Sequence, residues 1–100
     1  MHEKGEGKEK NMKAIITVVG RDTVGIIART SAVLATHSVN ILDITQSVLG
    51  DIFAMVMYVD IESCNIPFTD LVDEMDALGK EVGVVIHTMH EDIFNSMHRV

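Results

Sequence analysis

The chain has 100 residues, of which 47% are hydrophobic, and this length suits one small globular domain with a single core. Fifteen acidic against eight basic residues give a net charge of −7, which argues against a protein that binds nucleic acid by neutralising phosphates. No apolar stretch approaches the ~20 residues of a membrane span, so we expect no membrane insertion. The single cysteine, Cys64, excludes an intramolecular disulfide framework, and we expect a cytoplasmic protein.

Residues 1–11 are polar apart from Met1 and alternate charges of both signs, which predicts a disordered tail. The patterned part of the chain, residues 12–100, is expected to form one domain. Its first segment, residues 14–19, is β-branched and apolar and predicts a buried strand. Apolar residues then recur at helical spacing from Ile26 to Leu34, and this helix is expected to end near His37.

Residues 39–48 predict a second strand, with Leu42, Ile44 and Val48 on one face. A hairpin turn at residues 49–51, in which Gly50 takes a positive φ, leads into a third strand at residues 52–60. This third strand carries large apolar side chains on both faces. We therefore expect both of its faces to be covered, one of them by the helices and the other by a further surface.

Residues 61–67 are expected to form a loop before a second helix. Thr69 is a candidate N-cap of this helix, which is expected to end at Gly79 or Gly83. A fourth strand at residues 84–89 follows, and a terminal helix within residues 90–100 is expected to dock its apolar side on the domain.

This order of elements predicts an α+β ferredoxin-like βαββαβ sandwich, in which a four-stranded antiparallel sheet carries two helices on one face. The other sheet face is then apolar and uncovered, unless the terminal helix alone covers it. An uncovered apolar face marks an association surface, so we expect a homodimer or a larger homo-oligomer.

The candidate ligand site is the loop between the first strand and the first helix, together with the start of the second strand. Asp22 is placed to cap the helix, and Gly25 in its first turn leaves backbone N–H groups open to a ligand. Asn40 offers an amide donor and acceptor, or simply tolerates a left-handed φ. On spacing alone, an ordinary N-cap and a glycine that permits tight packing are the preferred explanation of the loop.

The segment GRDTVG at residues 20–25, followed by SAVLA at 31–35 and VNILDI at 39–44, resembles the ACT domains. These are small βαββαβ regulatory modules, commonly paired and commonly sensing amino acids. The resemblance covers about residues 13–89. The ending HEDIFNSMHRV at residues 90–100 is similar to that of the stand-alone ACT proteins of bacteria and archaea.

The resemblance implies that an amino acid binds between two subunits, held by Asp22, Thr23, Val24 and Gly25 of the loop and by Asn40. Gly20 stands where some members of the family have a histidine. Asp22 stands where an asparagine is common. An acid at this position would attract the ammonium group of a ligand and repel its carboxylate.

We therefore expect a non-catalytic regulatory module that binds a small effector, such as an amino acid, and signals to a partner protein without a cofactor or metal. One alternative is a purely structural protein-interaction module without a ligand. A more remote alternative is an acylphosphatase-like enzyme, in which Arg29 would cradle a phosphate and Asn40 would orient a water. His87, His90 and His98 lack the spacing of a metal site.

Overall fold

Four strands and three helices follow one another in the computed structural model, which describes residues 12–21 and 25–97. The elements are β1 (Lys13–Arg21), α2 (Ile26–Thr36), β2 (Asn40–Leu49), β3 (Ile52–Asp60), α3 (Phe68–Val82), β4 (Val84–His90) and α4 (Glu91–Met97). The predicted polar tail, residues 1–11, lies outside the described residues.

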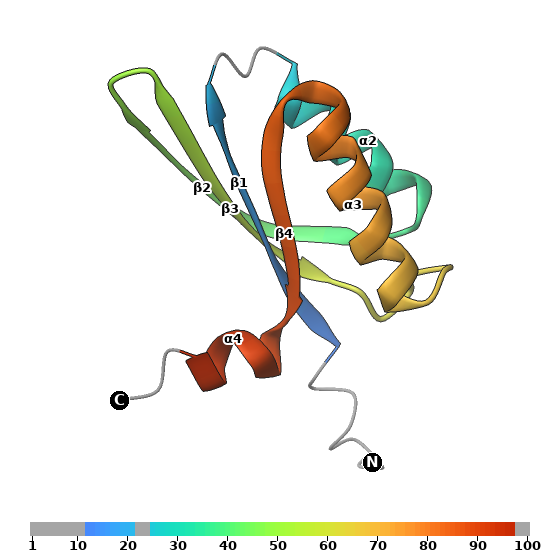
Figure 1. The fold of residues 1–100 in the computed structure, drawn as a ribbon. Coiled ribbons are helices and arrows are strands. Elements are labelled where there is room, and N and C mark those ends of the chain that lie inside the picture. Colours follow the sequence, from blue (N-terminus) through green and yellow to red (C-terminus); the bar gives the residue numbers. More distant parts are fainter. Residues whose placement is uncertain (1–11, 22–24, 98–100) are drawn as a thin grey trace.

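The four strands form one antiparallel sheet in the order β2-β3-β1-β4, so β2 and β4 are its edges. Helices α2 and α3 pack on one side of this sheet, as Figure 1 shows. The predicted ferredoxin-like βαββαβ sandwich is therefore confirmed. The hairpin turn between β2 and β3 is also as predicted, since Gly50 adopts a φ of 62°.

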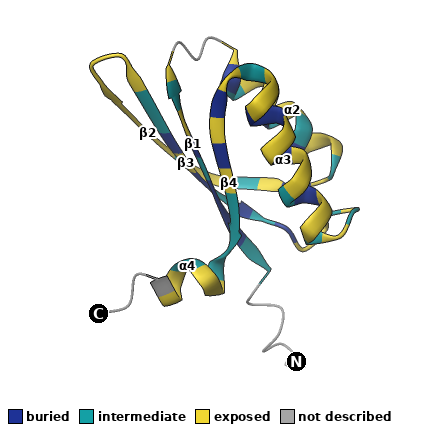
Figure 2. Cartoon of the chain, in the orientation of Figure 1, coloured by how far each residue is buried: buried dark blue, intermediate teal, exposed yellow. Residues whose placement is uncertain are grey.

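The core lies between the sheet and the two helices, and it follows the alternation of the strands. Every second residue of β1, including Ile16 and Val18, is buried against the helices. Met55 and Met57 of β3 are buried on the same side of the sheet. The helices contribute Leu34 from α2 and the buried residues Leu71, Met75 and Leu78 from α3. Figure 2 shows this buried layer between the sheet and the helices.

A β-bulge changes the face that β2 presents at its start. The register shifts between Ile41 and Asp43, so that Ile41 and Ile44 both lie on the core side, opposite Val59 and Met57. The prediction that Leu42 shares the face of Ile44 is therefore wrong, and Leu42 is 44% exposed. Strict alternation fails here because the extra residue of the bulge interrupts the period of two.

Helix α3 begins two residues earlier than predicted, because its N-cap is Pro67 rather than Thr69. Pro67 precedes it in extended conformation, so the helix starts at Phe68 and Thr69 is its second residue rather than its cap. The helix continues through Gly79 and ends at Gly83, whose φ of 83° is the left-handed conformation that glycine favours. Gly79 is tolerated inside the helix because α3 approaches β4 closely there. A Cβ on Gly79 would lie 2.7 Å from the carbonyl oxygen of Val84.

Helix α4 leaves the sheet on the side opposite to α2 and α3 (Figure 1). The hydroxyl of Tyr58 donates a hydrogen bond of 2.9 Å to Glu91 Oε2 at the start of this helix. Ile15 projects to the same side of the sheet and is only 8% exposed. The docking expected of this helix is thus found at its start, whereas Ile93 is 56% exposed and packs poorly against its own chain.

The contact at Gly79 makes a testable prediction for the packing of α3 on β4. In Gly79→Ala, the added methyl group meets backbone atoms that can move only if the helix and the strand separate. We expect a loss of about 1–3 kcal/mol in the free energy of unfolding, as other overpacked cores show. Thermal denaturation measures this loss, and the control Ala77→Ser, at an exposed position of the same helix, is expected to stay within about 0.5 kcal/mol of the wild type. Equal stabilities for the two variants would contradict the close approach.

Candidate functional site

The loop residues Asp22, Thr23 and Val24, which the sequence proposes as ligand contacts, lie outside the described residues. Gly25, the last residue of that proposal, is described, and it precedes α2 as its N-cap rather than standing in its first turn. Its φ of 81° is left-handed, which explains a glycine at this position. Apart from its chain neighbours, no atom of the described residues lies within 4 Å of the place where its Cβ would be, so packing among these residues does not explain the glycine.

Among the described residues, none beyond the chain neighbours of Gly25 covers the start of α2 on the side of this glycine. The carbonyl oxygen of Gly25 accepts the first helical hydrogen bond, at 2.9 Å from the N–H of Arg29. Gly25 has no side chain to accept the N–H groups that follow it, and these first N–H groups of a helix have no partner within the helix. A helix start of this kind favours a negatively charged group.

Asn40 lies at the opposite end of the molecule. It is the first residue of β2 and pairs with Asp60, the residue that also pairs with Lys13 at the start of β1. Its side chain is exposed. The suggestion that Asn40 takes a left-handed φ is wrong, because Ser38 does so in its place, with a φ of 61°.

Within one chain, the structure does not bring Gly25 and Asn40 together. Gly25 precedes α2 and Asn40 follows it, and the 11 residues of this helix span about 16 Å. The sheet shows the same separation. Gly25 lies beyond the end of β1 that pairs with the start of β3, and Asn40 pairs with the end of β3. A small ligand cannot contact both residues of one subunit.

The residues of the acylphosphatase alternative are separated in the same way. Arg29 lies in the first turns of α2 and forms an ion pair of 3.0 Å with Glu81 of α3, so its guanidinium is already engaged by a carboxylate. Asn40 lies beyond the other end of α2. The structure therefore gives that alternative no assembled phosphate site.

Metal ligation and membrane crossing are two further possibilities for residues 12–21 and 25–97. No group of three or more histidine, cysteine, aspartate or glutamate side chains in this part of the chain is arranged to hold a metal ion. None of the described helices combines the length and apolarity that a membrane crossing requires.

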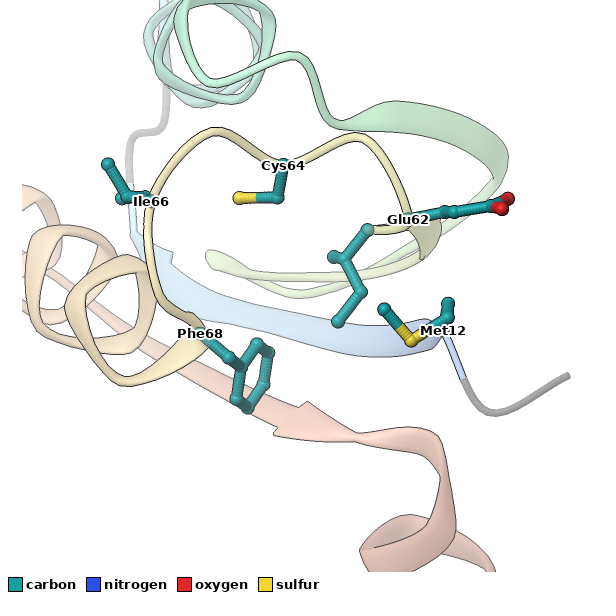
Figure 3. A pocket seen from close by; sticks show the side chains of 6 residues that line it. Met12, Glu62, Cys64, Ile66 and Phe68 are labelled. Carbon is teal, nitrogen blue, oxygen red and sulfur yellow. The ribbon is translucent and has the colours of Figure 1, made fainter. Parts of the chain in front are cut away.

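A cavity of about 160 Å³ opens at the end of the sheet where Asn40 lies, between the start of β1, the loop after β3 and the start of α3 (Figure 3). Its walls are mostly apolar, and they are formed by Met12, Ile61, Glu62, Cys64, Ile66 and Phe68. No side chain of this lining carries a positive charge or an amide. The carboxylate of an amino acid would find no strong donor here, so the cavity does not suit the expected effector.

The same loop also carries a hydrogen-bonded cluster that ties the two core helices together. His37, directly after α2, places Nδ1 2.9 Å from Asn65 Oδ1 and Nε2 2.8 Å from Glu74 Oε1 of α3. Asn65 in turn donates from Nδ2 to the carbonyl oxygen of Thr36 at 3.1 Å. Both ring nitrogens of His37 thus face acceptors, an arrangement that only the doubly protonated imidazolium satisfies.

These hydrogen bonds to Asn65 and Glu74, together with the negative charge of Glu74, raise the pKa of His37 above its ordinary value of 6.5. No local pattern predicts this cluster, because Asn65 and Glu74 are 28 and 37 residues away from His37 in the chain. His37 was expected only as the end of a helix.

The raised pKa of His37 predicts how stability depends on pH. Because the folded protein holds this proton more tightly than the unfolded chain, the stabilisation is fully present below the unfolded pKa of 6.5 and is lost as the pH rises through the higher folded pKa. We expect the stability advantage of the wild type over His37→Gln to shrink as the pH rises above 6.5.

Chemical denaturation across this pH range measures the advantage. Glu74→Gln is expected to remove much of the pH dependence, because it removes the charge that holds the proton. Glu81→Gln, which removes a carboxylate paired with Arg29 instead, is expected to keep it. A constant difference between the wild type and His37→Gln would contradict the assignment of an imidazolium.

Known proteins resemble this chain in sequence and in structure. The family model described as "ACT domain" matches residues 13–89. A UPF0237 protein of Methanopyrus kandleri is 47% identical over 88 residues, which cover 88% of this chain and 98% of that protein. A UPF0237 protein of Clostridium acetobutylicum is 48% identical over 89 residues, which cover 89% of this chain and all of that protein, at 100%.

Among solved structures, an ACT domain protein from Streptococcus pneumoniae is similar with a TM-score of 0.74 and 41% identity, over 87% of this chain and 98% of that chain. The ligand-free regulatory subunit of aspartate kinase from Thermus thermophilus matches with a TM-score of 0.59 and 21% identity, over 78% of this chain and 50% of that chain. The second likeness is one of fold alone.

Proposed function

Because this chain belongs to the ACT domain family, as a small stand-alone member of the UPF0237 group, we propose that it is a non-catalytic regulatory module that binds an amino acid between two copies of itself. ACT domains are generally regulatory modules that bind small effectors. The observation that carries the finer proposal is the separation of Gly25 from Asn40 within one chain. Two residues of one site that lie at opposite ends of a subunit require a second subunit.

The edge strand β2 supplies a way for two copies to meet. Its outer side has no partner among the described strands, because β2 is at the margin of the sheet. The strand is ten residues long and contains no lysine, arginine or proline, the residues that commonly protect a sheet edge. An edge of this kind favours pairing with a second strand.

Antiparallel pairing of β2 with β2 of a second copy places the start of one strand beside the end of the other. Leu49, at the end of β2, lies at the Gly25 end of the sheet, since it pairs with Ile52, which also pairs with Arg21. Asn40 of the partner subunit would then reach the Gly25 end of the first subunit. In this arrangement each pair of copies forms two equivalent sites.

The chemistry of such a site suits a zwitterion. The open backbone N–H groups at the start of α2 favour the carboxylate of an amino acid. Asn40 of the partner subunit offers a donor and an acceptor. Asp22 would attract the ammonium group, and the net charge of −7 disfavours effectors that carry only negative charge. Binding would stabilise one arrangement of the pair, which a partner protein would recognise.

Ligand binding tests this proposal. The purified protein is titrated with each common amino acid while its thermal midpoint is recorded. An effector at about 100 times its Kd adds about 2.7 kcal/mol of stability, which should raise the midpoint by roughly 10 °C or more. We expect one amino acid or a few related ones to give this shift.

Two variants then test whether Asn40 contributes to the ligand site. Asn40→Ala is expected to weaken binding at least about tenfold, which is the loss of one good hydrogen bond to a charged group, while the oligomeric state is kept. The control Asn95→Ala makes the same change on the exposed surface of α4 and should leave the affinity unchanged. Undiminished affinity in Asn40→Ala would contradict the shared site, and a panel without any shift would favour the purely structural module.

A further inference from the structure

The open face of the sheet, which is the side away from α2 and α3, carries a continuous apolar surface. Its exposed members are Val19, Leu49, Ile52, Val56 and Val85, which are 43%, 74%, 36%, 42% and 55% exposed. The register makes them neighbours. Val19 pairs with Val85 on one side and with Ala54 on the other, and Ile52 and Val56 stand two residues before and after Ala54 on the same face.

Charge is kept away from the middle of this surface. The residues between the apolar ones are uncharged, and they include Thr17, Thr45 and Ser47. Arg21, at one margin, is paired with Asp51 at 3.6 Å. The remaining titratable side chains of this face lie at the edges or towards the far end of the strands and are Lys13, Asp43, Tyr58, Asp60 and His87. The hydroxyl of Tyr58 is bonded to Glu91.

The absence of charge in the middle of the open face limits the kind of partner that can cover it. A chain with a net charge of −7 repels its own copies, and the repulsion is smallest where neither surface carries net charge. A strongly basic or acidic partner would find no complementary charges in the middle of the face. A second copy of the same chain brings a surface that is apolar and neutral in the same place.

Helix α4 borders the open face as a ledge. The Tyr58–Glu91 hydrogen bond fixes its start over one end of the face, and the helix stands on the same side as the apolar surface (Figure 1). Ile93 lies on this helix, and its own chain leaves it 56% exposed. Sheet and helix therefore form a corner rather than a flat surface.

We propose that two copies of this chain pack sheet against sheet through their open faces, with α4 of each copy closing over the end of the other. This pairing uses a different surface from the β2 edge, so the two contacts are compatible and together give a tetramer. The proposal is independent of the ligand, because the apolar surface that carries it includes neither Gly25 nor Asn40.

The size of the surface supports a role for α4. Four strands at about 4.8 Å spacing and about seven residues of each strand cover a footprint on the order of 450 Å² per copy. Stable interfaces bury roughly 600–1,000 Å² on each partner, so the sheet alone falls short. Contacts of α4 with the facing copy add the missing area.

Molar mass in solution tests the pairing, measured by sedimentation equilibrium on the full chain. We expect about 44 kDa for the wild type, four times the 11.0 kDa of one chain, and about 22 kDa for Val56→Glu and for Val85→Glu. Two variants at exposed positions guard against misfolding of either one, and circular dichroism checks both. The charge-matched control Ala77→Glu, on the outer surface of α3, should remain a tetramer.

Other outcomes separate this proposal from the preceding one. A wild-type dimer that Val56→Glu leaves intact would overturn pairing through the open face and leave edge pairing in place. A wild-type dimer that Val56→Glu splits into monomers would keep the open-face contact and overturn pairing through β2. A monomeric wild type would overturn both.

The part played by α4 has its own test. Ile93→Glu is expected to raise the dissociation constant of the tetramer at least about tenfold, since it places a charge on the ledge against the facing copy. Asn95→Glu adds the same charge two residues later, on the opposite side of the helix, and should leave the constant unchanged. Equal constants for the two variants would remove α4 from the interface.

Discussion

Strand β1 is the element on which the rest of the structure depends. It lies inside the sheet, between β3 and β4, so its backbone is bonded on both sides and both neighbours take their register from it. Its core side is fully covered by the helices, since Ala14, Ile16 and Val18 are completely buried. Its other side belongs to the open face. One strand thus anchors the core and at the same time centres the surface that remains apolar.

The order and type of the elements could be predicted because each is encoded locally. The period of two in β1 and β3, the helical stripe ending at Leu34 and the turn at Gly50 need only neighbouring residues to be recognised. Of the positions that differed, the bulge depends on contacts with another strand, whereas the start of α3 depends on the proline directly before it. The start of α3 shifted because Pro67 sets the preceding backbone, and the bulge in β2 follows the pairing with β3.

The candidate site was predicted less completely, for a related reason. Resemblance to a family selects the residues, and the open backbone at Gly25 agrees with that selection. It does not say on which subunit each residue lies, and only the strand register shows that Asn40 is at the far end of the sheet. The cluster of His37, Asn65 and Glu74 was missed because no local pattern joins residues so far apart in the chain.

The two edges of the sheet differ in a way that bears on how far assembly proceeds. At β2 the regular backbone runs from Asp43 to Leu49 without interruption beyond the bulge. At β4 the strand has only seven residues, and the chain turns directly from His90 into α4, so the helix stands at the end of that edge. In the proposed pairing through β2, a short β4 that ends directly at a helix offers little edge to a further copy, and this favours a closed particle over a fibre.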